Sequence, residues 1–168
     1  VGSEMCIRDS RRLVEHGCRF VTAAGYKYNE WDSHSKNNQD HRDKLCPPLD
    51  QALAALMEDL EKRGMLASTL VLVMGEFGRT PRVNATGGRD HWGALMSILM
   101  AGGGLQMGQV IGASTPKGEV PAQRAVHPND VLTMVYRHLG IDPAGHTVNL
   151  DGRPIPILPD GQPIRELI

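Results

Sequence analysis

The chain has 168 residues, a formal net charge of −1 at pH 7, 40% hydrophobic residues and 22% charged residues. These values are typical of one globular domain and exclude a disordered or fibrous protein. A net charge near zero gives no reason to expect nucleic acid as a partner. The longest apolar runs, such as residues 94–101, are too short to cross a bilayer, so no membrane span is predicted.

The first ten residues differ in character from the rest. They read VGSEMCIRDS, with no initiator Met and no apolar signal core. This string resembles translated sequencing-adaptor sequence at the ends of environmental gene fragments, so we predict that residues 1–10 are not native. On this prediction, residues 11–168 are the C-terminal part of one larger domain.

The first half of the chain is predicted to contain a helix end, a strand and a long helix. Residues 11–16 end a helix, and residues 18–24 form a short strand. From Leu49 onward, apolar side chains recur at the spacing of an amphipathic helix. We expect Leu56 and Leu60 to be buried on the apolar face of that helix.

The second half is predicted to supply the centre of a sheet. Residues 69–74 are a continuous apolar run, typical of a parallel strand that is buried on both faces. Residues 94–101 fit either a helix or a strand, and we predict a strand because glycines bound them. A further strand is expected at residues 109–113 and a second amphipathic helix at residues 128–139. This alternation predicts an α/β fold with a mostly parallel sheet flanked by helices.

Clusters of polar side chains fall on the predicted loops. In parallel sheets, ligands bind at the carboxyl ends of strands. Because at least two of the polar loops would open onto the same edge of the sheet, we expect their side chains to converge. The candidate metal ligands are Asp32, His34, Glu76, Asp90 and His91.

Three carboxylates in one place need a compensating positive charge. Two unit charges about 4 Å apart repel by roughly 4 kcal/mol at an effective dielectric constant of about 20. Either a bound cation or the nearby Arg79 and Arg89 would neutralise them. Mixed imidazole and carboxylate ligands favour a divalent ion, zinc, manganese or iron. With a metal present, the two arginines are candidates for binding a tetrahedral oxyanion.

Each candidate ligand also has a structural interpretation. The Asp-x-His of residues 32–34 could form a turn with an Asx hydrogen bond. Glu76 could pair with Arg79, and the Asp-His of residues 90–91 could be a carboxylate that orients a structural histidine. Their joint occurrence on loops favours the metal site. No serine occupies the elbow position of residues 75–78, and no nucleophile is assigned.

Several motifs are similar to those of a bacterial family, the domain of unknown function 1501 family. The resemblance covers residues 11–168, and it is carried by WDSH at 31–34, PPLD at 47–50, MGEFGRTP at 74–81, GRDHW at 88–92 and DGRPI at 151–155. That family in turn resembles the superfamily of alkaline phosphatases, sulfatases and cofactor-independent phosphoglycerate mutases.

The wider resemblance implies a ligand set. By position, the Asp-x-His of residues 32–34 matches a ligand pair, and His91 matches a late ligand histidine. Glu76 and Phe77 stand where an Asp-His ligand pair is expected. Phenylalanine cannot bind a metal, so only one ion is expected unless Asp90 substitutes. The nucleophile and the first metal-binding Asp of the superfamily lie in the first half of the fold, which precedes this sequence.

The resemblance implies a metal-dependent hydrolase or transferase acting on phosphate or sulfate esters, with a small molecule or a glycan as substrate. It also implies export to the periplasm, because members of the family commonly carry a twin-arginine signal upstream. The alternative is a non-catalytic exported binding or scaffold protein with a degenerate metal site. Phe77 favours this alternative.

Overall fold

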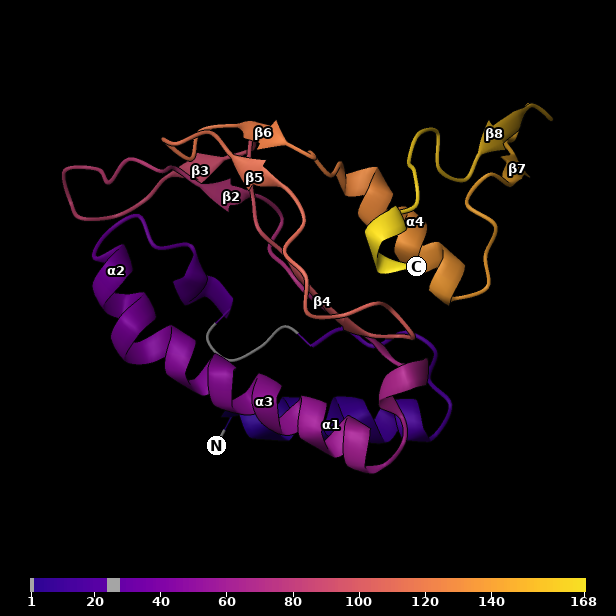
Figure 1. Cartoon of the computed structure of the whole chain (residues 1–168), viewed down its shortest axis with the longest axis horizontal. Coiled ribbons are helices and arrows are strands. Elements are labelled where there is room, and N and C mark those ends of the chain that lie inside the picture. The colour runs from indigo at the N-terminus through magenta and orange to yellow at the C-terminus, as the bar shows by residue number, and fades with distance from the viewer. Residues whose placement is uncertain (1, 24–27) are drawn as a thin grey trace.

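The structure is a computed structural model that describes residues 2–23 and 28–168, except for the side chains of residues 2–6, 28 and 29. Two long helices, α1 (Gly2–Glu15) and α3 (Cys46–Lys62), lie side by side. Figure 1 shows them on the opposite side of the molecule from α4 (Pro128–His138). Within the described part of the chain, no helix has both the length and the apolar character needed to cross a bilayer.

Helix α3 forms where the apolar periodicity predicts it. Prolines occupy its first turn, where their missing N–H groups cost nothing. Its inner face buries Ala52 and Leu60, and Leu45 in the preceding turn is also buried. The prediction of a buried Leu60 is therefore confirmed, whereas Leu56 is only partly buried because it faces an open cleft.

Shorter helical turns lie before α3, after α3 and at the C-terminal end. They are the 3₁₀ turn Tyr28–Trp31, α2 (Asn37–Asp40), the π-helical turn His41–Leu45, and the 3₁₀ turns Leu66–Ser68 and Arg165–Leu167. Helix α4 begins with a capping box in which the Asn129 N–H bonds His127 Nδ1 and the His127 N–H bonds Asp130 Oδ2.

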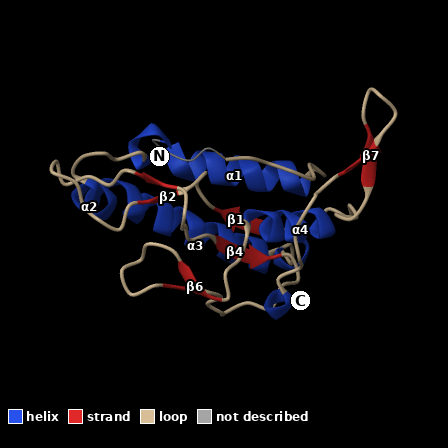
Figure 2. Ribbon diagram, turned by 90° about the horizontal axis from the view of Figure 1, so that it is seen from above, coloured by secondary structure: helices blue, strands red, loops and turns tan. Residues whose placement is uncertain are grey.

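The strands of the described residues form four antiparallel pairs. These pairs are β1 (Leu70–Val73) with β4 (Leu99–Gly102), β2 (Gly78–Arg79) with β3 (His91–Trp92), β5 (Ala113–Ser114) with β6 (Pro121–Gln123), and β7 (His146–Val148) with β8 (Pro154–Pro156). The β7–β8 hairpin projects from the rest of the molecule in both views (Figures 1 and 2).

The prediction of an α/β fold with a mostly parallel sheet is wrong, because every strand pair among the described residues is antiparallel. Residues 69–74 do contain β1, but the chain from β1 to β4 passes through the β2–β3 hairpin. Parallel pairing needs a crossover connection, usually a helix, and no helix lies between these two strands.

Other predicted strands also differ from the structure. Residues 18–23 form no strand, and residue 24 lies outside the described residues. The predicted strand at 94–101 is reduced to β4, and that at 109–113 is replaced by β5, which starts at Ala113.

The core lies between α4, the C-terminal turn and the β1–β4 pair. Val131 and Met134 of α4 are buried together with Ile164 and Leu167. Six partly buried apolar side chains pack against these four, namely Leu72, Ile98, Met100, Leu105, Ile111 and Val126. We call Val131, Met134, Ile164 and Leu167 the α4 core.

Candidate metal centre

Two segments meet at the candidate site and are joined by backbone hydrogen bonds. The first site loop (residues 32–36) follows the turn Tyr28–Trp31, and the second site loop (residues 80–90) connects β2 to β3. Arg89 N–H donates to Ser33 O at 3.1 Å and Lys36 N–H donates to Thr86 O at 3.2 Å. These bonds fix the register of one loop against the other.

Gly88 allows the two loops to approach this closely. A Cβ atom at residue 88 would lie 2.0 Å from the His34 carbonyl oxygen and 1.9 Å from the His34 carbonyl carbon. No side chain fits at such distances, so a residue other than glycine would force the loops apart. The close approach of the two loops positions His34 at the candidate site.

The β2–β3 pair places the remaining groups. Its register sets Arg79 directly opposite His91. Gly78 is required here as well, because a Cβ atom would lie 1.8 Å from the Leu95 carbonyl oxygen. The pair thereby brings His91 and Arg79 to the carboxylate of Asp32.

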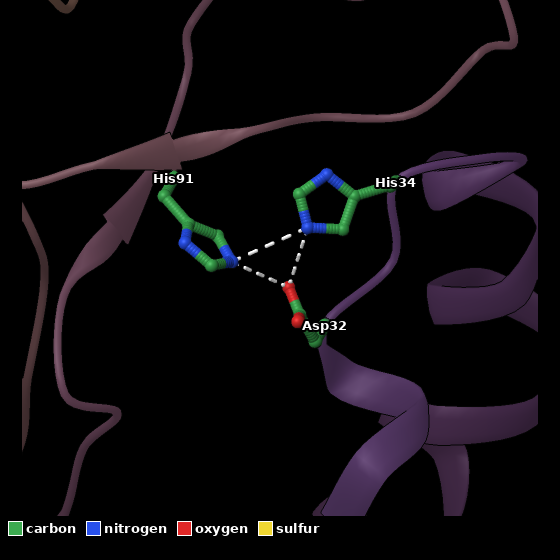
Figure 3. A group of neighbouring side chains, drawn as sticks. All are labelled: Asp32, His34 and His91. Carbon is green, nitrogen blue, oxygen red and sulfur yellow. Dashed lines mark hydrogen bonds and ion pairs between the residues drawn. The ribbon is translucent and has the colours of Figure 1, made fainter.

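Three potential ligand atoms converge on one point, from Asp32, His34 and His91 (Figure 3). Asp32 Oδ1 lies 3.0 Å from His34 Nε2 and 2.9 Å from His91 Nε2. The two Nε2 atoms are 3.2 Å apart. Ligand atoms bound about 2.0–2.2 Å from one zinc ion are separated by roughly 3 to 3.5 Å, so the three atoms fit a shared ion.

The protonation of His34 also fits a cation at this point. His34 Nδ1 lies 2.8 Å from Asp90 Oδ1, and an ionised carboxylate only accepts hydrogen bonds. This contact favours the tautomer with its proton on Nδ1, in which Nε2 is the ring nitrogen that can bind an ion. Nε2 faces Asp32 Oδ1, so a shared ion fits between them.

Asp90, Asn84 and Thr86 form the hydrogen bonds that position His34. Asn84 Nδ2 donates to Asp90 Oδ1 at 3.2 Å and to His34 O at 3.1 Å, and Thr86 Oγ1 donates to His34 O at 2.8 Å. A carboxylate on the far nitrogen of a ligand histidine fixes the tautomer and raises the basicity of the ligand nitrogen. Asp90 is therefore placed to orient His34.

Sequence reasoning missed Asn84 and Thr86. The side-chain oxygen of Asn84 accepts hydrogen bonds from the N–H groups of Thr86 at 3.1 Å and Gly88 at 2.8 Å. An asparagine two residues before threonine in a glycine-containing loop is a recognisable signal for such a turn. The sequence signal predicts the turn but does not identify His34 as the partner.

Positive charge lies directly beside the cluster. The Arg79 guanidinium donates a hydrogen bond to Asp32 Oδ1 and, with the hydrogen bond from His91, lowers the pKa of Asp32 to about 2. The hydrogen bond from His34 lowers the pKa of Asp90. Both carboxyl groups are therefore ionised at neutral pH, and Arg79 competes with any metal ion for Asp32.

The other predicted site residues lie apart from this point. Glu76 is exposed between β1 and β2 and is not one of the three converging residues. Arg89 Nη1 donates to the carbonyl oxygens of Thr80 and Pro81, both at 2.7 Å, so it supports the second site loop. Phe77 packs on His91, with ring centroids 4.4 Å apart.

The cluster is open to solvent. The side chains of Asp32 and His34 are each 48% exposed and that of His91 is 51% exposed. Structural zinc sites are closed by four protein ligands, whereas catalytic sites keep a position open for water or substrate. The exposure and the three-residue set match the open type.

Comparison with known proteins gives one match. The model of a family described as "Protein of unknown function (DUF1501)" matches residues 5–168, nearly the whole chain. No curated protein and no solved structure matches the chain.

Proposed function

The chain belongs to the DUF1501 family, and we propose that it binds one divalent transition-metal ion, zinc, manganese or iron, and acts on phosphate or sulfate esters as a hydrolase or transferase. The convergence of Asp32 Oδ1, His34 Nε2 and His91 Nε2 carries the proposal. Its ligand types suit these three metals, and its exposure leaves room for a substrate oxygen.

Each residue has a distinct role in this proposal. Asp32, His34 and His91 hold the ion, and Asp90 keeps the His34 ring in the orientation and tautomer that direct its Nε2 lone pair at the ion. Arg79 lies beside the ion and is the group best placed to bind a substrate oxyanion. The bound metal would supply Lewis-acid stabilisation of charge on the transferred group.

The reaction class rests on the sequence motifs. The described residues contain no parallel sheet, so the proposed relationship to alkaline phosphatases and sulfatases is supported by the motifs at 31–34, 74–81 and 88–92 and by the ligand types. The same relationship suggests that residues 11–168 are the C-terminal part of a longer, exported protein. The nucleophile of the reaction would then lie upstream.

A specific contact favours a second candidate function, a non-catalytic metal-binding or scaffold protein. Phe77, which stands at the sequence position where the superfamily resemblance implies a further ligand, packs against His91 with ring centroids 4.4 Å apart. Because phenylalanine cannot bind a metal, only one ion is expected at the site. The two candidates share the metal and differ in turnover of an ester.

Metal content tests the site. Protein purified without chelator is expected to hold about one transition-metal ion per chain, measured by elemental analysis. His34→Ala and His91→Ala should each weaken binding by at least about tenfold in competition with a chromogenic chelator, because two remaining ligands hold an ion poorly. His146→Ala is the matched control, since His146 lies in the projecting β7–β8 hairpin.

Equal metal loss in all three variants, or no metal in the parent protein, would contradict the proposal. Full-length, metal-loaded protein that includes the upstream part and hydrolyses neither aryl phosphates nor aryl sulfates would favour the scaffold function. Turnover that disappears in His34→Ala and survives in His146→Ala would favour the enzyme.

A further inference from the structure

The carboxylate oxygen that is a candidate metal ligand is also the hydrogen-bond partner of Arg79. The Arg79 guanidinium donates to Asp32 Oδ1, the oxygen that faces Nε2 of His34 and of His91 (Figure 3). A carboxylate oxygen offers about two lone pairs, so it cannot serve an ion and all of these nitrogen groups at once. Arg79 is the one neighbour that cannot itself bind a metal, because its guanidinium stays protonated and has no lone pair to donate. An ion at the convergence point would therefore displace Arg79 from Oδ1.

The backbone around Arg79 keeps its side chain at the site after such a displacement. Residue 79 lies in β2 directly opposite His91, and the next residue, Thr80, donates its N–H to Asp90 O at 2.9 Å. The Arg79 side chain is only 20% exposed, whereas that of Asp32 is 48% exposed. A guanidinium that loses Asp32 is thus expected to remain beside the cluster and not to turn out into solvent.

Phe77 gives the guanidinium a second contact. Arg79 Cζ lies 5.7 Å from the centroid of the Phe77 ring, within the range of a cation–π interaction. The same ring packs on His91, with ring centroids 4.4 Å apart. The attraction of a ring for a cation acts on the charge and requires no N–H donor. The donors that Arg79 withdraws from Asp32 would therefore be available to an oxyanion.

We propose that Arg79 alternates between two partners, Asp32 when no metal is bound and the substrate oxyanion when one is, so that metal and oxyanion bind cooperatively. This alternation rests on the proposed function, since it concerns the same ion and the same substrate oxygen. A metal ion takes Asp32 Oδ1 and frees Arg79 for the oxyanion. An oxyanion draws Arg79 away and leaves Oδ1 to the ion. Such coupling is reciprocal, so each ligand raises the affinity for the other by the same factor.

The metal then sets the order of binding at the site. While Arg79 is held by Asp32, its hydrogen bonds are not fully available to an oxyanion. Arg89, the other arginine predicted to bind an oxyanion, donates through Nη1 to two backbone carbonyl oxygens at 2.7 Å. The chain should therefore bind an oxyanion tightly only after the ion is in place.

The coupling is measured with zinc and inorganic sulfate as the probes. Zinc affinity of the purified chain is determined by competition with a chromogenic chelator, once in sodium sulfate and once in sodium chloride of the same ionic strength, so that screening is equal. Sulfate should tighten zinc binding by at least about tenfold. Part of this effect comes from direct contact of sulfate with zinc, and a variant at residue 79 separates that part.

Arg79→Gln removes the side chain on which the alternation depends. Its zinc affinity in chloride should be higher than that of the parent protein, because the competitor for Oδ1 is gone. Sulfate should then change the zinc affinity by less than about threefold. Arg82→Gln is the matched control, since Arg82 is an exposed arginine of the second site loop, and it should keep the full coupling.

Phe77 is a positioning residue in this proposal, because it acts through Arg79. Phe77→Leu should lower the coupling factor by about two- to fivefold, the range that exposed cation–π interactions represent, while zinc still binds in chloride. Phe77→Tyr keeps the aromatic ring and should restore the coupling. A merely structural role of Phe77 would change zinc affinity in chloride and sulfate equally and leave the coupling factor unchanged.

Equal coupling in the parent protein and in Arg79→Gln would overturn the proposal, because the effect would then come from contact between sulfate and zinc alone. Zinc binding that sulfate does not tighten in the parent protein would overturn it as well, and so would weaker zinc binding by Arg79→Gln in chloride. In each of these outcomes zinc still binds to the parent protein. They are therefore distinct from failure of the proposed function, in which the parent protein binds no metal and both proposals fall.

Discussion

The candidate metal centre and the α4 core are held together by different interactions. In the α4 core, Val131 and Met134 are 7% and 4% exposed and pack against Ile164 and Leu167. In the metal centre the side chains are about half exposed, and the two site loops are joined by backbone hydrogen bonds and by the close contact at Gly88.

This difference predicts that stability and metal affinity depend on different residues. Apolar burial stabilises the α4 core in proportion to the area removed from water, whatever the detailed shape of the site. The candidate metal centre buries little apolar surface and depends on the relative position of two loops that are distant in sequence. Substitutions should therefore affect either folding or metal affinity, and rarely both. The predictions below test this separation, from the largest expected effect to the smallest.

Met134→Ala should produce the largest effect, and on stability alone. Removing a buried side chain leaves a cavity, so the free energy of unfolding should fall by about 2–5 kcal/mol in chemical denaturation. Leu132→Ala, two residues away on α4 and 40% exposed, should cost less than about 1 kcal/mol. Metal affinity of the folded protein should be unchanged in both variants. A large loss of metal affinity in Met134→Ala would show that the α4 core and the candidate metal centre depend on each other.

Gly88→Ala is an exception to this separation, because it should lower both metal affinity and stability. Its Cβ atom cannot fit beside the His34 carbonyl group, so the loops must move apart and metal affinity should fall by at least about tenfold. Stability should fall by about 1–3 kcal/mol. Gly93→Ala is the control, because a Cβ atom there meets nothing within 4 Å. Equal metal binding by both variants would show that the loop contact does not position His34.

Arg79→Gln should raise metal affinity. The guanidinium of Arg79 contacts Asp32, where it repels a bound cation and competes for Oδ1, so its loss should tighten binding by about three- to tenfold. Affinity for inorganic phosphate in the metal-loaded protein should fall, since an oxyanion contact is removed. Arg82→Gln, at an exposed position of the second site loop, should change neither affinity. Weaker metal binding in Arg79→Gln would mean that Arg79 positions Asp32 for the ion.

The smallest effect concerns acid stability beside the α4 core. Arg124 lies 2.8 Å from Glu166 through Nη2 and Oε2 and lowers the pKa of Glu166 from 4.5 to about 2. Because the folded pKa is lowered, this pair stabilises the fold above about pH 4.5, and its contribution is lost as the pH falls towards 2. Glu166→Gln should remove that pH-dependent contribution in urea denaturation, with Glu119→Gln as the control. A difference between wild type and variant that grows below pH 4.5 would contradict this sign.

Local sequence patterns predicted α3 and α4 well, but they predicted only the C-terminal end of α1. The apolar spacing from Leu49 gave α3, and the pattern at 128–139 gave α4 to within one residue. The position of β1 was also predicted correctly from residues 69–74. Its partner and direction were not, because four apolar residues pair equally well in either orientation. In the structure β1 and β4 pair antiparallel, and the β2–β3 hairpin lies between them in sequence.

The candidate site was also predicted only in part from the sequence. Asp32, His34 and His91 do lie together, although the expected cause, a shared edge of a parallel sheet, is absent. They meet because β3 presents His91 and because Gly88 lets one loop lie on the other. Glu76 was predicted by the same argument and lies apart.

By itself the sequence determined where α3 and α4 form and which side chains can bind a metal. These properties depend on neighbours within a few residues, where spacing and side-chain chemistry are decisive. The tertiary structure alone decided which strands pair. It also decided that Asp90 Oδ1 lies beside His34 Nδ1, a contact between residues 56 positions apart in the sequence. Contacts of that length depend on the folding of all the intervening chain, which no local pattern records.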